Sequence, residues 1–141
     1  MKMDREEFLK ALSEGRRDFR GENLSCLDLH GVDLCGVDLC GVDLSRANLS
    51  GADLRRARLN QAYLMQADFN RADLRWARLN QAYLNGANLR WADLRWARLN
   101  QAYLMQADLK GANLRWADLN GAWIDEDLAE SAKSRGAIMN F

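Results

Sequence analysis

One histidine and three cysteines are the residues of this sequence best suited to bind a metal ion. His30, Cys35 and Cys40 follow one another at intervals of five residues, and Cys26 precedes them. Imidazole nitrogens and thiolates are the ligands that zinc prefers in structural sites. Two of the thiols could instead form a disulfide if the fold brought them close together.

Carboxylates also recur, and paired carboxylates can act as general acid and general base. Aspartate or asparagine stands directly before successive leucines in the first half of the chain: Asp28, Asp33, Asp38, Asp43 and Asn48. These residues form a catalytic cluster only if the fold turns them toward one cleft.

Arginine and aromatic residues recur at a longer interval of 20 residues. Three columns have this spacing: Arg58, Arg78 and Arg98, then Trp76, Trp96 and Trp116, then Tyr63, Tyr83 and Tyr103. Exposed arginine, tryptophan and tyrosine are the residue types that contribute most to the energy of protein interfaces. These nine residues are the candidate interaction face.

A leucine at every fifth residue indicates how the chain positions all of these side chains. The series extends from Leu24 to Leu119, with Phe69 in one of its places and Ile124 after its end. Neither an α-helix nor a flat strand keeps every fifth residue on one side. The pattern requires each pentapeptide to form a short extended run and then turn a corner. The leucine and the residue two before it, usually alanine, then both face inward.

The similarity of the sequence to itself is greatest at a shift of 20 residues. Residues 55–74, 75–94 and 95–114 are nearly copies of one another. Four pentapeptides therefore complete one coil, and coils should stack about 4.8 Å apart. The absence of proline agrees, because each coil must donate backbone N–H groups to its neighbour. We expect an all-β solenoid with four sides and a leucine core.

This fold argues against metal binding and against catalysis. His30, Cys35 and Cys40 occupy one pentapeptide position on three successive corners, so their side chains diverge, and Cys26 lies at another corner position. Successive aspartates occupy different sides of the coil, and a core filled by leucine leaves no room for a pocket. We expect free thiols, no metal, no cofactor, no catalytic residues and no enzymatic activity.

The pattern A-[DN]-L-x-x resembles the pentapeptide repeat family. The segments ANLSGADL at 47–54 and GANLRWADLNGA at 111–122 are typical of that family, and the resemblance extends over roughly residues 17 to 126. It implies a right-handed quadrilateral β-helix, here of about five and a half coils. It also implies a non-enzymatic and often bacterial protein. The handedness follows from the resemblance and not from the periodicity.

Both ends of a solenoid need covers, because their coil edges carry unpaired backbone groups. We divide the chain into an N-terminal capping helix (1–16), the β-helix (17–126) and a C-terminal helix with its tail (127–141). Within the first of these, Asp4 and Glu7 form a D-x-x-E start signal for a helix over 4–14.

The C-terminal segment should contain a second helix over roughly 127–134, begun by Asp125 or Asp127. The apolar tail is expected to fold back on the last coil or to join a second chain: Ala137, Ile138, Met139 and Phe141. Related members of the family can dimerise through C-terminal elements, so the resemblance leaves a homodimer through these residues open.

The corners themselves suggest two turn geometries. Glycine often holds the last repeat position, which suits a type II turn with positive φ. Trp76, Gln81, Trp91 and Arg71 hold the same position elsewhere. Because large side chains resist positive φ, we expect a different turn at those corners.

The outer columns have a structural and a functional interpretation. Arg55, Arg75 and Arg95 lie beside Asp53, Asp73 and Asp93, and these neighbours should pair. The column of Arg58, Arg78 and Arg98 has carboxylates only at its ends. Self-packing would place Arg78 and Arg98 over Trp76 and Trp96 in cation–π contacts. The functional hypothesis is a binding face for a protein or, less favoured, for single-stranded nucleic acid stacked on the tryptophans.

Composition limits the partners and the compartment. The chain has 20 basic and 20 acidic residues and a net charge of zero, so nothing attracts it generally to nucleic acid or anionic membranes. No apolar run approaches the ~20 residues of a membrane span. The first residues lack the apolar core of a signal peptide. We expect a cytoplasmic protein without membrane contact.

Three functions remain open from the sequence. The preferred one is a non-enzymatic scaffold that presents stacked side-chain ladders to a protein partner of unknown identity. A DNA-mimic protein that interacts with a topoisomerase (gyrase), as in quinolone-resistance members of the family, should carry an acidic surface and is disfavoured by the neutral charge. The nearly identical coils also suit a consensus-like or designed scaffold with no evolved ligand, although Phe69 and the cysteines break the pattern.

Overall fold

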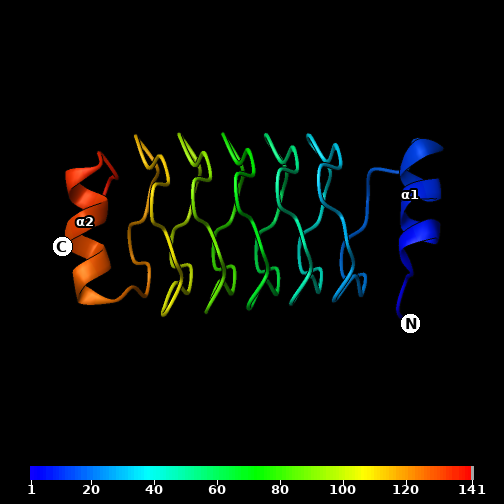
Figure 1. The fold of residues 1–141 in the computed structure, drawn as a ribbon, viewed down its shortest axis with the longest axis horizontal. Coiled ribbons are helices and arrows are strands. Elements are labelled where there is room, and N and C mark those ends of the chain that lie inside the picture. Colours follow the sequence, from blue (N-terminus) through cyan, green and yellow to red (C-terminus); the bar gives the residue numbers. More distant parts are fainter. Residues whose placement is uncertain (141) are drawn as a thin grey trace.

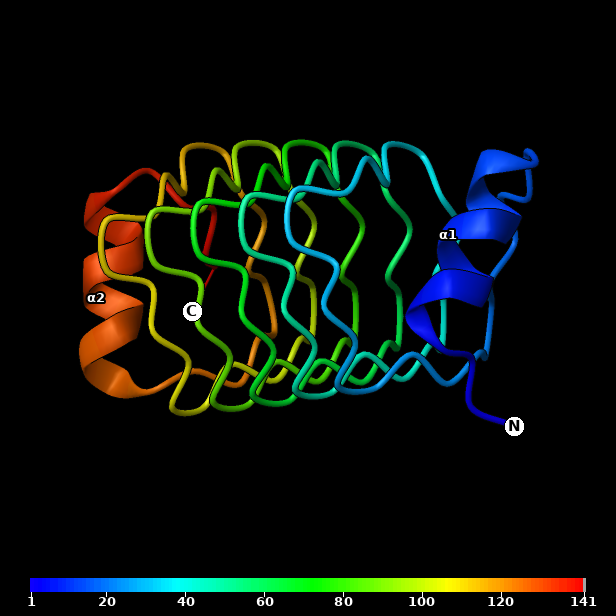
Figure 2. The ribbon, with the colours of Figure 1, turned by 45° about the vertical axis from the view of Figure 1, so that its right-hand side comes forward.

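The computed structural model describes residues 1–140 and contains two helices, α1 (Arg5–Ser13) and α2 (Glu126–Ser134). Between them the chain winds into stacked coils, with α1 at one end of the stack and α2 at the other (Figure 1). The turned view shows the chain closing around a central axis in each coil (Figure 2). Each pentapeptide contributes one bridging residue and a two-residue turn instead of a longer strand. Neither helix has the length and apolarity to cross a membrane.

The coils pair in parallel with a register of 20 residues. Bridges join Asp18 to Asp38 near the N-terminal end and Tyr103 to Trp123 near the C-terminal end. At Arg78, the backbone N–H donates to the carbonyl of Ala57 at 2.9 Å. The N–H of Leu79 donates in the other direction, to the carbonyl of Arg98 at 2.7 Å. This register confirms that four pentapeptides complete one coil.

The core is a stack of leucines with alanine or valine beside them. The leucines of the series from Leu24 to Leu119 are at most 2% exposed, and Phe69 is fully buried in its place among them. No polar or charged residue is buried in the part of the chain that the structure describes. Full burial of such a side chain is worth about 1.5–3 kcal/mol, so the repeated leucine is the main source of stability. The predicted assignment of inward and outward residues is confirmed.

The aspartates and asparagines before the leucines hold the corners. The carboxylate of Asp33 accepts a hydrogen bond from the N–H of Cys35 at 3.0 Å, and Asn48 accepts from the N–H of Ser50 at 3.0 Å. This is the local side chain to backbone bond that favours Asp and Asn in turns. The residue type at this position therefore has a structural role.

The prediction of two turn geometries is wrong. The residue at the last repeat position has φ of 64° at Trp76, 60° at Gln81 and 60° at Trp96, close to 66° at Gly51. The stack imposes one turn, because the N–H of this residue donates to the next coil, as from Trp76 to the carbonyl of Arg95 at 3.1 Å. The left-handed conformation costs about 1–2 kcal/mol for a non-glycine residue, and burial and coil pairing offset that cost.

Helix α1 lies over the first coil. Asp4 accepts from the N–H of Glu7 at 2.8 Å, and the Glu7 carboxylate accepts from the N–H of Asp4, which completes the predicted capping box. Phe8 is fully buried, and its ring centre lies 4.6 Å from that of Phe19 in the first coil. This contact attaches the helix to the leucine core.

Helix α2 begins at Glu126, after Asp125. The Asp125 carboxylate does not cap the helix, because it accepts a hydrogen bond from the N–H of Gln106 at 2.9 Å. The following tail folds back on the last coil, where Ile138 bridges to Asp118 and Met139 is 7% exposed. Of the predicted apolar tail, Phe141 lies outside the described residues.

Candidate interaction face

The nine candidate residues line two neighbouring grooves on the solenoid surface. The arginine–tryptophan groove lies along Arg58, Arg78 and Arg98 and along Trp76, Trp96 and Trp116, and has a volume of about 560 Å³. The tyrosine–glutamine groove lies along Tyr63, Tyr83 and Tyr103 and along Gln61, Gln81 and Gln101, and has a volume of about 620 Å³. The two grooves have different internal contacts.

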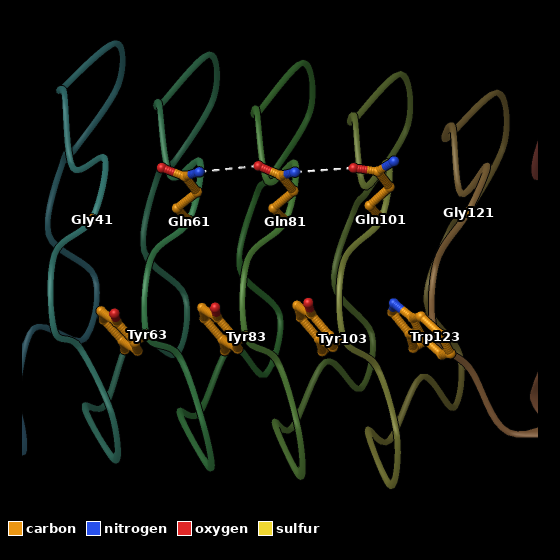
Figure 3. A pocket seen from close by; sticks show the side chains of 9 residues that line it. All are labelled: Gly41, Gln61, Tyr63, Gln81, Tyr83, Gln101, Tyr103, Gly121 and Trp123. Carbon is orange, nitrogen blue, oxygen red and sulfur yellow. Dashed lines mark hydrogen bonds between the residues drawn. The ribbon is translucent and has the colours of Figure 1, made fainter.

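The tyrosine–glutamine groove satisfies its own side chains. The ring centres of Tyr83 and Tyr103 are 4.8 Å apart with planes 1° from parallel, and Tyr63 continues the stack. The Gln61 amide donates to Gln81 at 3.1 Å, and Gln81 donates to Gln101 at 3.0 Å. Figure 3 shows these amides forming a row above the row of parallel rings. The groove resembles the amide and aromatic ladders of cross-β stacks, which stabilise the stack itself.

The tryptophans of the other groove also stack on one another. Trp76 and Trp96 have ring centres 4.8 Å apart, and Trp96 and Trp116 are 5.1 Å apart, with planes within 16° of parallel. Their inner ring faces are covered by neighbouring rings, while their edges face the solvent. A nucleic acid base stacks on an open aromatic face. This geometry removes the stacking that the single-stranded nucleic acid hypothesis required.

The predicted cation–π contacts are wrong in their partners. The guanidinium groups that lie over the rings are those of Arg56 on Trp76, at 5.7 Å, and Arg115 on Trp116, at 4.7 Å. Arg95 lies 5.8 Å from the ring centre of Trp96. The central rings already cover one another, and the arginines that approach the stack belong to the same corner as the tryptophans, unlike Arg78 and Arg98.

The second arginine column is neutralised by aspartates, as predicted. Arg75 donates two hydrogen bonds to Asp73, at 2.9 and 2.6 Å, and approaches Asp93 on the next coil at 3.6 Å. Arg55 and Arg95 pair in the same bidentate manner with the aspartate two residues before them. The charges of Arg55, Arg75 and Arg95 are therefore paired, whereas Arg115, which continues the column after Asn113, lies over Trp116.

The pKa values of these carboxylates reflect the pairing. Hydrogen bonds from the Arg55 side chain lower the pKa of Asp53 below its ordinary value. Partial burial opposes the charged form of Asp93, but hydrogen bonds from Arg95 outweigh it and lower the pKa. In the first coil, the Arg20 side chain lowers the pKa of Asp18 to about 2. All three remain ionised at neutral pH.

The column of Arg58, Arg78 and Arg98 is different. Arg58 approaches Asp38 at 3.6 Å at one end. Within residues 1–140, the guanidinium groups of Arg78 and Arg98 have no hydrogen bond, ion pair or ring contact. Both side chains are exposed, and their backbones bridge on adjacent coils. Two like charges thus lie side by side without a carboxylate in ion-pair contact.

Arginine in this column displaces the residue that normally holds the corner. At the ends of the column, Asp38 and Asp118 accept from the N–H two residues later, as elsewhere in the solenoid. After Arg78, the N–H of Asn80 instead donates to the side chain of Asn60 on the preceding coil, at 3.0 Å. The asparagine column therefore supplies the acceptor that the arginines lack.

The candidate metal ligands and disulfide partners do not come together. His30 Nδ1 lies 2.7 Å from the carboxylate of Asp28, and Cys26, Cys35 and Cys40 are free. Burial raises the pKa of the Cys40 thiol, which makes it a poorer nucleophile. No group of three or more histidine, cysteine, aspartate or glutamate residues in the described part of the chain is placed to hold a metal.

The nine candidate residues omit several that also line the arginine–tryptophan groove, among them Arg56, Asn100, Asp118 and Ile138. Ile138 lines its C-terminal end and is 41% exposed. The signal was available, because Ile138 follows Asp118 by one full coil of 20 residues. The apolar tail was expected to fold back on the last coil or to join a second chain, and its bridge to Asp118 also extends the groove.

The stacked coils define a β-solenoid of pentapeptide repeats, and comparison with known proteins agrees. The family model for pentapeptide repeats matches eight copies over residues 23–61, 47–86 and 87–122. These segments include more than half of the chain, which therefore belongs to the pentapeptide repeat family. No curated protein matches the sequence at a significant level.

Solved structures of pentapeptide repeat proteins are similar to this one. HetL, involved in heterocyst differentiation regulation in the cyanobacterium Nostoc sp. strain PCC 7120, is 35% identical over 85% of this chain, with a TM-score of 0.53. The match covers 53% of HetL, so this chain spans about half of that protein's length. AT2G44920, from the thylakoid lumen of Arabidopsis thaliana, is 24% identical over 89% of this chain and 82% of its own, with a TM-score of 0.53.

Proposed function

We propose that this protein is a non-catalytic scaffold that presents the arginine–tryptophan groove to a protein partner. In this proposal the β-helix has about five and a half coils and α1 and α2 close its ends. The leucine core makes the outer columns rigid, which lowers the entropy that binding must overcome. The groove supplies exposed arginine and tryptophan, the residue types enriched at interface hot spots.

One observation carries the proposal: Arg78 and Arg98 have no partner within residues 1–140. They stand where the repeat ordinarily has Asp or Asn, and Asn60 and Asn80 supply the acceptors for their corners. The fold therefore does not need arginine here, and two adjacent like charges oppose folding slightly. These arginines do not contribute to stability, so binding of an anionic ligand would explain their presence.

The DNA-mimic hypothesis finds less support. A mimic that competes with DNA for a topoisomerase should present acidic groups at the spacing of phosphates. This chain has a net charge of zero, and the carboxylates of Asp53, Asp73 and Asp93 pair with arginines. We expect no inhibition of gyrase supercoiling by the protein, and inhibition at stoichiometric concentration would restore that hypothesis.

Affinity capture from nuclease-treated cytosol tests the scaffold function. The bait is the full chain, compared with a groove variant, Arg78→Gln/Arg98→Gln. A matched control, Arg55→Gln/Arg75→Gln, removes the same charge from the column paired with aspartates. We expect a partner that the wild type and the control retain and the groove variant loses. Equal recovery by all three baits would show that this groove is not the interaction face.

A further inference from the structure

The arginine–tryptophan groove has a charge pattern that defines its ligand more closely. The charged groups at its centre, Arg78 and Arg98, are cationic and unpaired within residues 1–140. Asp118 is the one carboxylate among the described residues that line it, and Asp38 lies one coil before Arg58, 3.6 Å from its guanidinium. Guanidinium groups bind carboxylates with charge-assisted hydrogen bonds. The groove thus complements a short row of anionic groups aligned with the solenoid axis.

The spacing of the row is set by the stacking of the coils. Neighbouring tryptophans and tyrosines on successive coils are 4.8–5.1 Å apart. Arg58 and Arg98 are separated by two such steps, which is about 10 Å. An anionic partner that engages all three arginines needs three charges over that length.

An α-helix meets this requirement better than an extended strand. Residues i, i+4 and i+7 lie on one side of a helix and span about 10.5 Å. In a strand, three residues on one side span about 13.5 Å, so the outer charges would lie beyond the ends of the arginine column. A helix with one carboxylate per turn therefore follows the column nearly in register.

The tryptophan column selects against nucleic acid and in favour of a protein surface. The inner ring faces are covered, so bases have no platform between Trp76, Trp96 and Trp116. The exposed parts of the indoles, with Trp76 47% and Trp116 46% exposed, form an apolar wall beside the arginines. Small apolar side chains that flank the carboxylates of a helix would pack on that wall.

We propose that the arginine–tryptophan groove binds an acidic α-helix of the partner protein, aligned with the solenoid axis and carrying one carboxylate per turn on its contacting side. Arg78 and Arg98 form the central ion pairs, and the tryptophan edges contact the flanking residues. This inference rests on the proposed scaffold function and specifies the surface that the scaffold recognises.

Titration of the full chain with labelled synthetic peptides tests the inference by fluorescence anisotropy. The striped peptide is a helix with glutamate at i, i+4, i+7 and i+11 among alanine and glutamine. The control peptide has the same composition with its glutamates distributed around the helix. We expect the striped peptide to bind about tenfold more tightly. Binding should weaken as salt is raised, since exposed charges are screened.

Two protein variants locate the binding. Arg78→Gln/Arg98→Gln should weaken striped-peptide binding by about tenfold or more. Arg55→Gln/Arg75→Gln, which changes net charge equally at two arginines paired with aspartates, should change it less than about twofold. A further variant, Arg78→Asp/Arg98→Asp, restores the repeat's ordinary residue, so it should fold and yet lose binding. Circular dichroism and thermal melting of every variant verify the fold.

The outcomes separate this inference from the scaffold function. Equal affinity for the striped and redistributed peptides, or equal loss in both glutamine variants, would overturn the acidic helix. Tighter binding of a single-stranded oligonucleotide with the same number of charges would overturn it in favour of nucleic acid. If affinity capture still finds a partner that depends on Arg78 and Arg98, the scaffold function stands without the acidic helix.

Discussion

The indole ring of Trp91 occupies the space that a side chain at Gly111 would need on the next coil. A Cβ at Gly111 would lie 2.6 Å from Cδ2 of Trp91, closer than real Cβ contacts. Gly51 is in the same column, has a similar φ of 66°, and has nothing within 4 Å of its Cβ position. Glycine at 111 is therefore favoured for two reasons: its positive φ, and the indole ring of Trp91 that leaves no space for a Cβ.

Gly111→Ala should lower stability more than Gly51→Ala. Both changes place a side chain at positive φ, at about 1–2 kcal/mol. Only the first also forces Trp91 away from the backbone, which we expect to add about 1–3 kcal/mol. Urea unfolding measures both variants. The double variant Trp91→Ala/Gly111→Ala should lose the extra penalty, and equal losses for the two single variants would contradict this explanation.

Asn80→Ala should destabilise the solenoid by about 1–3 kcal/mol, because the N–H of Asn100 loses its acceptor. Adding Arg98→Asp should recover most of this loss. An aspartate at 98 can accept from the N–H of residue 100, as Asp118 accepts from Asn120. A double-mutant cycle by chemical denaturation measures the coupling. Additive effects of the two changes would refute the view that the asparagine column replaces the missing aspartates.

Leu79→Asp should cost several kcal/mol, since it buries a charge without a partner. Ala77→Leu should cost about 1–3 kcal/mol by overpacking the same coil. Both positions have no exposed surface. Arg78→Asp, between them in the sequence, is the matched outward control and should melt near the wild-type temperature. Similar melting of all three variants would show that the inward assignment is wrong.

Stability should fall as the pH drops from about 4 toward 2. Asp18, Asp53 and Asp93 have folded pKa values below the ordinary one, about 2 for Asp18. Their contribution is complete above the unfolded pKa and disappears as the pH falls through the folded pKa. The urea midpoint between pH 6 and 2 measures this effect, which is small and reduced by salt because the pairs are exposed. Asp53→Asn/Asp93→Asn should flatten the profile, and an unchanged profile would contradict the pairing.

Most of the fold was predictable because it depends on the regular spacing of residue types along the chain. Leu79 and Ala77 face inward since residues two apart in an extended run point to the same side. The register of 20 residues appeared in the sequence as near-identical coils. The turns were not predictable from residue type. Trp76 adopts positive φ because its N–H must reach the next coil, and that demand outweighs the preference of its side chain.

The sequence alone determined which side chains are inside, which are outside, and which share a column. Only the tertiary structure decided how the outer side chains divide among their neighbours. The pairing of Arg75 with Asp73 followed from their spacing, but the sequence also placed Arg78 over Trp76, whereas the structure puts Arg56 over that ring and leaves Arg78 without a partner within residues 1–140. The residues of the core were predictable because short apolar side chains occupy the same two positions of each pentapeptide. A long arginine can reach several groups on its own and adjacent coils, so its partner depends on what those coils place within reach.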